Sequence, residues 1–299
     1  MRRISLVALL LLLTLALSGC AALNILQPTI TVTDDLGREV TLQRVANRIV
    51  SLAPSSTELL FALGIAEKVV GVTDLCDYPP QAAAKEEVGS FGSPSVEKIV
   101  SLKPDLVLAA SLHRTAAEQL IALGIPVIVL NPENIQGVID NAELLGKVAG
   151  AARGATEVKR QISGDVRSVD ERIRDLTSEQ RPLVYYEVWS DPIMTAGPNT
   201  LIHELITRAG GINLAADAAT NYPTLALEDL LVRQPHVMFY GHAVETVTQI
   251  AQRPHWATIP AIRDGRVYLV DENLVLRPGP RIGQALKTLA SLLHPDLWR

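Results

Sequence analysis

Two stretches of this sequence share one design, and that repetition limits the possible folds more than any other feature. Residues 95–110 read SVEKIVSLKPDLVLAA, and residues 226–241 read ALEDLLVRQPHVMFYG. In each stretch a glutamate lies seven residues before a proline, and an apolar run follows the proline. Since proline cannot continue a helix, each stretch predicts a short helix that ends at the proline, followed by a buried strand.

A second pair of stretches repeats in the same order. The segment RIVSLAPSSTELLFALG, residues 48–64, parallels the segments LVYYEVW and PNTLIHELITRAGG, which lie between residues 183 and 211. Both predict a strand, a turn and a helix closed by glycine. Two matches in one order predict two related lobes, an N-terminal lobe over residues 29–150 and a C-terminal lobe over residues 181–299.

Apolar runs alternate with helical segments along both lobes, which indicates parallel sheets covered by helices on both faces. The strands expected in the N-terminal lobe are residues 48–53, 68–73, 104–110 and 125–130. Residues 29–42 alternate apolar and polar side chains on either side of Asp-Leu-Gly, which predicts a hairpin that precedes the first sheet. The predicted fold class is therefore α/β, with two Rossmann-like lobes.

One long helix is expected to join the lobes. Residues 154–177 place Val158, Ile162, Val166, Val169 and Ile173 at three- and four-residue steps, so one face of that helix is apolar. A segment of this length forms about 36 Å of α-helix. A single backbone helix over residues 151–180 resists bending, so we expect small closing motions and a nearly preformed cleft at the carboxyl ends of the strands.

The N-terminus has the pattern of an export signal. Arg2 and Arg3 precede an apolar run over residues 4–17, which is shorter than the roughly 20 residues of a membrane-spanning helix. The run ends in Leu-Ser-Gly-Cys, which resembles a bacterial lipobox. The resemblance implies that residues 1–19 are a signal peptide, that Cys20 is lipidated, and that residues 20–28 tether an extracytoplasmic protein to the membrane. The alternative is a cleaved signal with a coincidental cysteine.

Charge and cysteine content exclude some classes of protein. Without residues 1–19 the chain has 25 basic residues, the 27 of the full chain less Arg2 and Arg3, against 32 acidic residues. This excess of acid argues against non-specific binding of nucleic acid. Cys76 is the only other cysteine, so no disulfide within the mature chain is expected.

The chain resembles the substrate-binding lipoproteins of bacterial ABC importers. The resemblance covers residues 29–299 and is carried by DDLGREVTL, RIVSLAPSSTELLFALG, CDYPP, SVEKIVSLKPDLVLA, TAGPNTLIHELITRAGGINLAAD and RDGRVYLVD. These motifs are similar to those of the class with one rigid backbone helix, the class III periplasmic-binding-protein fold, which carries cobalamin, haem and ferric siderophores. The stretch DYPPQA most resembles the cobalamin-binding branch.

The resemblance implies a function as well as a fold. It implies a monomer, without a cofactor of its own, that captures a corrinoid or related metal chelate and delivers it to a permease dimer. Haem or a ferric siderophore is the alternative ligand, because Leu75 replaces an aromatic residue common in the cobalamin branch. Asn273, Leu274 and Val275 likewise replace an acidic or aromatic pair.

Six residues are predicted to contact the ligand: Ser55, Cys76, Phe91, Trp189, Tyr222 and Arg277. The resemblance matches Phe91 and Tyr222 to aromatic cleft positions of the family, where flat rings pack on one another. Trp189 ends a predicted strand at the carboxyl edge. Five of the six have a structural alternative, namely a place in the core for Phe91 and Trp189, a helix cap for Ser55, a buried loop thiol for Cys76 and a salt bridge within the lobe for Arg277.

The histidines do not have the paired spacing of a metal site, and no metal site is predicted. His113 and His242 follow strands, so either is an alternative ligand for haem iron. Arg281 is expected at the start of the last helix, residues 281–294.

Glu97 and Glu228 occupy equivalent positions in the two repeats. The family resemblance implies that one acidic residue on each lobe docks on arginines of the permease. The alternative is a favourable interaction of each carboxylate with its own helix dipole.

No catalytic residue is predicted. The sequence lacks the G-x-S-x-G, G-x-x-x-x-G-K-[ST], G-x-G-x-x-G and H-E-x-x-H motifs. The alternatives from other classes are a secreted lipoprotein hydrolase, using Ser55 with a distant histidine, and a lipoprotein adhesin or sensor.

Overall fold

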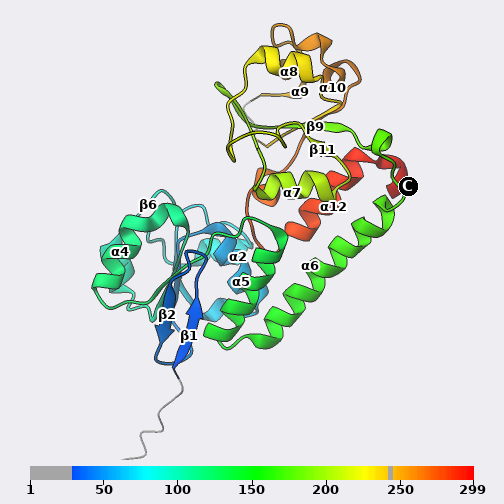
Figure 1. Ribbon diagram of the computed structural model, residues 1–299. Helices are drawn as coiled ribbons and strands as arrows, with labels where there is room; N and C mark the ends of the chain where they lie inside the picture. Colours follow the sequence, from blue (N-terminus) through cyan, green and yellow to red (C-terminus); the bar gives the residue numbers. More distant parts are fainter. Residues whose placement is uncertain (1–28, 242–244) are drawn as a thin grey trace, which may run out of the picture.

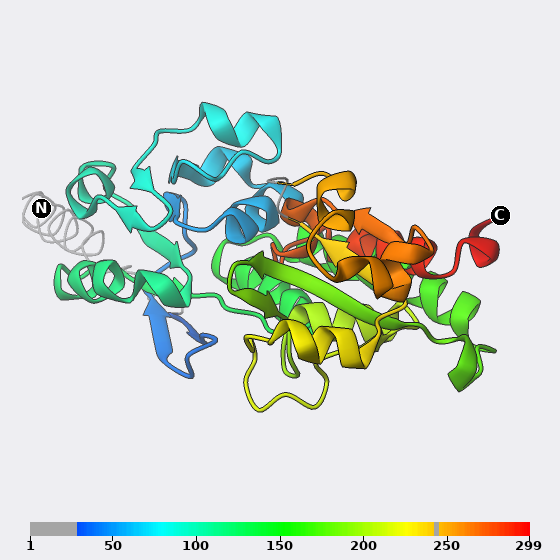
Figure 2. The ribbon, with the colours of Figure 1, turned by 90° about the horizontal axis from the view of Figure 1, so that it is seen from above.

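The computed structural model describes residues 29–241 and 245–299, which form two α/β lobes joined by one long helix, α6 (Ala152–Ile173) (Figure 1). The predicted signal peptide, the tether and the lipidation site Cys20 lie outside the described residues, as does His242. Within the two described ranges, no helix is both long enough and apolar enough to cross a membrane. Seen from above, the lobes lie side by side (Figure 2).

The N-terminal lobe contains a four-stranded sheet in the order β4-β3-β7-β8, and every neighbouring pair is parallel. Its strands are β3 (Ile49–Ser51), β4 (Val69–Val72), β7 (Leu106–Ala109) and β8 (Val127–Val129). Its helices are α2 (Pro54–Ala62), α3 (Val96–Ser101), α4 (Arg114–Ala122) and α5 (Ile135–Val148). Leu106 and Leu108 pack in one apolar cluster, while Val107 and Ala109 pack in another. The parallel sheet is therefore buried on both faces, as the sequence predicts.

Two antiparallel pairs accompany this sheet. The predicted hairpin forms between β1 (Ile30–Thr33) and β2 (Glu39–Leu42). A shorter pair, β5 (Gly89–Ser90) and β6 (Ser93–Pro94), was not predicted and holds Phe91 at its turn.

The C-terminal lobe contains a five-stranded sheet in the order β10-β9-β12-β13, with β11 also paired to β9. Its strands are β9 (Leu183–Ser190), β10 (Ile193–Thr195), β11 (Ile212–Asn213), β12 (Val237–Tyr240) and β13 (Val267–Leu269). Its helices are α7 (Leu201–Arg208), α8 (Leu227–Arg233), α9 (Val247–Ala251), α10 (Pro260–Arg263), α11 (Glu272–Val275) and α12 (Ile282–Leu293). The pairs of β9 with β11 and β12, and of β12 with β13, are parallel, as the sequence predicts. At the edge β10 was not predicted: the chain turns at residues 191–192 and returns antiparallel to β9.

The repeated sequence unit forms the same structural unit in both lobes. In the first lobe α3 is followed by β7, which pairs parallel to β3; in the second α8 is followed by β12, which pairs parallel to β9. Ser95 caps α3 by accepting a hydrogen bond from the Lys98 amide. The duplication visible in the sequence is thus a duplication of helix, strand and strand pairing.

Helix α6 packs against α5 of the first lobe and α12 of the second (Figure 1). It begins two residues before the predicted start and ends at Ile173, where the apolar stripe ends and the chain turns. Val158, Ile162 and Val169 are buried in one apolar cluster that contains residues of both lobes, such as Leu145 and Leu286. The two lobes therefore share a continuous core through α6.

Charged groups also join the lobes. Glu58 on α2 is 2% exposed, and its carboxylate accepts two hydrogen bonds of 2.7 Å from the Arg281 guanidinium. Arg277 Nη1 lies 3.4 Å from Glu58 Oε1 and 2.6 Å from Asp77 Oδ1. We call Glu58, Asp77, Arg277 and Arg281 the inter-lobe clasp. It connects two carboxylates of the first lobe with two arginines of the second.

Two glycines of α6 provide a test of its packing. A Cβ at Gly154 would lie 2.2 Å from the Leu63 carbonyl oxygen, whereas a Cβ at Gly164 meets nothing within 4 Å. Gly154→Ala should therefore lower the free energy of unfolding by about 1–3 kcal/mol. Gly164→Ala should raise it by about 0.5–1 kcal/mol, because alanine favours the helix. Urea denaturation followed by circular dichroism measures both; equal effects would contradict the close packing at Gly154.

The clasp predicts a second stability difference. Arg281→Met should lower the free energy of unfolding by about 3 kcal/mol, because the buried Glu58 charge loses two hydrogen bonds of 2.7 Å and keeps only the longer contact of 3.4 Å with Arg277. The control Arg160→Met breaks an exposed pair with Glu157 on α6 and should cost less than about 1 kcal/mol. A cost for Arg281→Met no larger than the control's would show that the clasp does not stabilise the fold.

Candidate functional site

A cavity of about 690 Å³ lies between the lobes. Its lining in the first lobe comes from the loops that follow β3, β4, β7 and β8, at the carboxyl ends of parallel strands, and from the turn between β5 and β6. Its lining in the second lobe comes from the start of α7, the loop around residue 221, and residues 272–278, which follow β13. This is the position where open α/β sheets bind ligands, and the volume is within the usual range of roughly 300–1,000 Å³ for small-molecule sites.

The floor of the cavity begins at the N-terminus of α2. Ala53 is the N-cap residue and Pro54 occupies the first turn, where a proline fits without losing a helical hydrogen bond. Ser55 is the next residue and lines the cavity. The alternative that Ser55 caps the helix is therefore wrong, since the cap position belongs to Ala53.

Phe91 lines the cavity from the turn between β5 and β6. Its amide donates to Asp74 Oδ1 at 2.7 Å, and its carbonyl lies 2.7 Å from His113 Nε2. Because His113 Nδ1 accepts from the Ala110 amide at 2.9 Å, the proton lies on Nε2, which donates to Phe91. The two rings also meet edge to face, with centroids 5.2 Å apart. These contacts fix the turn that carries the aromatic ring.

The role of His113 follows from the same contacts. The side chain is 2% exposed, and burial lowers its pKa. Both ring nitrogens are used within the lobe, and His113 does not line the cavity. The alternative that His113 ligates haem iron is therefore wrong; its structural role is to hold the Phe91 turn. Residues 29–241 and 245–299 contain no group of three His, Cys, Asp or Glu side chains arranged for a metal.

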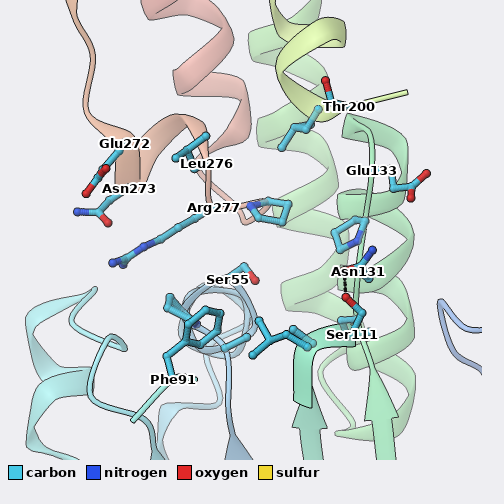
Figure 3. A pocket seen from close by; sticks show the side chains of 18 of the residues that line it. Ser55, Phe91, Ser111, Asn131, Glu133, Thr200, Glu272, Asn273, Leu276 and Arg277 are labelled. Atoms are coloured by element: carbon cyan, nitrogen blue, oxygen red, sulfur yellow. Dashed lines mark hydrogen bonds between the residues drawn. The ribbon is translucent and has the colours of Figure 1, made fainter. Parts of the chain in front are cut away.

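Arg277 lies between the two lobes and lines the cavity (Figure 3). It forms a salt bridge, but with Asp77 and Glu58 of the other lobe rather than within its own lobe. A hydrogen bond from this guanidinium lowers the pKa of the Asp77 carboxyl. Arg281 precedes α12, as expected, and stacks its guanidinium 3.9 Å from the centre of the Tyr78 ring. Arg277 therefore serves the clasp and the cavity wall together.

Two predicted contacts are not part of the cavity lining. Cys76 is 2% exposed, with Thr57 and Thr73 hydroxyls at 3.2 and 3.4 Å from its sulfur, and burial raises the pKa of the thiol. Trp189 is 54% exposed and lies in the β9–β10 hairpin, where its indole donates to the Asp191 carbonyl at 2.9 Å. The prediction for Cys76 is wrong because the side chain turns under α2, and that for Trp189 because β9 continues past the cavity edge.

Tyr222 does line the cavity, from the loop that precedes α8. Burial and the nearby Glu133 carboxylate raise the pKa of its hydroxyl. Ser55, Phe91, Tyr222 and Arg277 are thus the four predicted contacts that the structure brings together.

The sequence prediction missed most polar groups of the lining. They are Ser111, Asn131, Glu133, Asn199, Thr200, Asn221 and Glu272, while Asn273 was considered only as a departure from the family. Ser111 donates to Asn131 Oδ1 at 2.9 Å across neighbouring strand ends (Figure 3). Ligands of open α/β sheets bind beyond the carboxyl ends of the strands. That general rule could have identified residues 131–133 and 272–273, because they lie just beyond β8 and β13. Asn199 and Asn221 lie in loops without that signal.

Glu97 and Glu228 are exposed in the first turns of α3 and α8. Within the described part of the chain neither forms a salt bridge. The structure therefore leaves both carboxylates accessible to a partner, in equivalent positions on the two lobes.

Comparisons with known proteins agree with this architecture. The sequence profile of the family described as periplasmic binding protein matches residues 49–274. The ABC transporter substrate-binding lipoprotein YvrC of Bacillus subtilis, itself uncharacterised, is 33% identical over 276 residues, which are 90% of this chain and 87% of that protein. A vitamin B12-binding protein of Vibrio cholerae is 31% identical over 252 residues, covering 83% of this chain and 89% of that protein.

A solved structure gives the same result for the fold. The apo form of the periplasmic haem-binding protein RhuT from Roseiflexus sp. RS-1 superposes with a TM-score of 0.75 at 30% identity, covering 84% of this chain and 99% of the other. The fold is that of the class III periplasmic binding proteins, as the motifs predict. With its profile match, its relatives and its two lobes on one backbone helix, the chain belongs to the periplasmic binding protein family.

Proposed function

We propose that this protein is the extracytoplasmic substrate-binding component of an ABC importer, and that it captures a corrinoid in the cavity between its lobes. The observation that carries the proposal is the composition of that cavity, whose lining combines apolar side chains with four side-chain amides. Phe91, Leu75 and Leu112 supply apolar surface on the first lobe, and Leu276 supplies it on the second. A flat ring packs on such surfaces, and the amides suit the carboxamide groups at a corrin's edge.

The relatives support a metal-containing ring as the ligand, but they do not distinguish a corrinoid from haem. Similar proteins are named for binding vitamin B12 and haem. Haem is the second candidate because the RhuT structure covers a similar share of this chain, 84% against 83% for the vitamin B12-binding protein, at a similar level of identity.

Delivery to a permease follows from the two exposed carboxylates. Glu97 and Glu228 occupy the same place in two related lobes, so they present paired charges to a permease dimer with two-fold symmetry. The Leu-Ser-Gly-Cys motif at Cys20 supports anchoring by lipid, which keeps a monomeric binding protein near its importer.

The binding proposal is tested by calorimetric titration of the purified protein with dicyanocobinamide, hydroxocobalamin, haemin and a ferric siderophore. Saturable binding of the corrinoids, and not of haemin, is the expected result. Phe91→Ala should weaken corrinoid binding about tenfold, because a ring contact and its buried area are lost. Trp189→Ala is the matched control and should change affinity less than about twofold, since Trp189 lies off the cavity. Tight binding of haemin with no corrinoid binding would refute the proposed ligand.

The docking proposal is tested by uptake of labelled cobinamide in cells. The double variant Glu97→Ala/Glu228→Ala should lose uptake while its affinity for cobinamide in solution stays unchanged, because neither residue lines the cavity. Asp229→Ala, an acid beside Glu228 in the same helical turn, should retain uptake. Normal uptake by the double variant would exclude these residues from docking.

A further inference from the structure

Some charged side chains that line the cavity are paired with an opposite charge, and others are not. Among the described residues, its lining includes three of them: Glu133, Glu272 and Arg277. Arg277 is committed to the clasp, with Asp77 at 2.6 Å and Glu58 at 3.4 Å. Since the clasp sets two arginines against two carboxylates, it is neutral as a unit. The single cation of the lining is thus already balanced by groups outside the cavity.

Glu133 and Glu272 have no such balance. Over residues 29–241 and 245–299 neither carboxylate has a basic group within salt-bridge distance. They come from different lobes and lie at opposite ends of the cavity, with Arg277 between them (Figure 3). Burial combined with the Glu272 charge raises the pKa of the nearby Tyr186 hydroxyl, just as burial and Glu133 raise that of Tyr222. The cavity therefore holds two excess negative charges.

The remaining polar groups of the rim are neutral. Four carboxamides, Asn131, Asn199, Asn221 and Asn273, line the cavity. Each of these side chains can both donate a hydrogen bond to a ligand carboxamide and accept one from it. A ligand carboxylate has only acceptors, so it can pair with the amide N–H groups but not with the amide oxygens. A ligand with several carboxylates would in addition face Glu133 and Glu272, and like charges brought together oppose binding.

We propose that Glu133 and Glu272 are specificity-determining residues that make the cavity accept rings with an amide periphery and reject rings with a carboxylate periphery. The inference rests on the proposed corrinoid function and narrows it. It predicts discrimination between two ligands that share one ring and one metal, and differ only in their peripheral groups.

The test compares dicyanocobinamide with dicyanocobyrinic acid, which carries carboxylates in place of amides on the same corrin. The wild-type protein should bind cobinamide at least about 100-fold more tightly, equivalent to about 2.7 kcal/mol. Glu133→Gln/Glu272→Gln should reduce this ratio about tenfold by improving the binding of cobyrinic acid, because the repulsion between carboxylates is removed. Raising the salt concentration from 0.1 M to 1 M, which shortens the screening length from about 10 Å to about 3 Å, should reduce the wild-type ratio.

The control is Glu171→Gln/Glu179→Gln, which removes the same charge from exposed positions outside the cavity. It should leave the ratio unchanged. Retained cobinamide binding together with an unchanged ratio in Glu133→Gln/Glu272→Gln would overturn this inference alone. Equal effects of the control would do the same, because they would assign selectivity to net charge. Failure of the wild-type protein to bind cobinamide would overturn the proposed function and the inference together.

Discussion

The structure depends on how one buried carboxylate is satisfied. Glu58 has almost no access to water, and a buried charge is tolerated only when it is paired and hydrogen-bonded. Its partners, Arg281 and Arg277, belong to the other lobe. Satisfying Glu58 therefore requires the lobes to be in register, and that register places α2, with Ser55 at the cavity floor, opposite the loop that follows β13.

The apolar contacts of α6, like the clasp, hold the two lobes in one relative position. The helix contributes to one cluster that runs from α5 to α12, so bending it would open contacts on both lobes. A second polar tie lies nearby, where Glu204 of α7 accepts a hydrogen bond of 2.7 Å from the Ile135 amide at the start of α5. The two lobes are thus held together by apolar contacts and by hydrogen bonds between charged and polar groups.

The fold was readable from the sequence because its evidence is local and repeated. Periodicity and proline positions predict most helices and strands of each lobe. The duplicated unit predicts that there are two lobes. The cavity was readable in part, since Phe91 and Tyr222 lie in loops matched by the family. Cys76 and Trp189 failed because burial under α2 and the extension of β9 into a hairpin depend on tertiary packing. The pairing of Glu58 with Arg281, separated by 223 positions, leaves no local pattern.

The placement of the cavity lining has a consequence for how such a protein diversifies. The cavity lining lies mostly on loops and turns, among them those after β3, β7, β8 and β13, while the groups that hold the lobes together lie mainly on α2, α5, α6 and α12. Arg277 is shared by both sets. Exchange of most lining residues therefore changes the surface of the cavity alone, whereas a change at Arg277 alters both the cavity wall and the contact between the lobes. Most positions of the lining can therefore vary without removing a contact that joins the lobes.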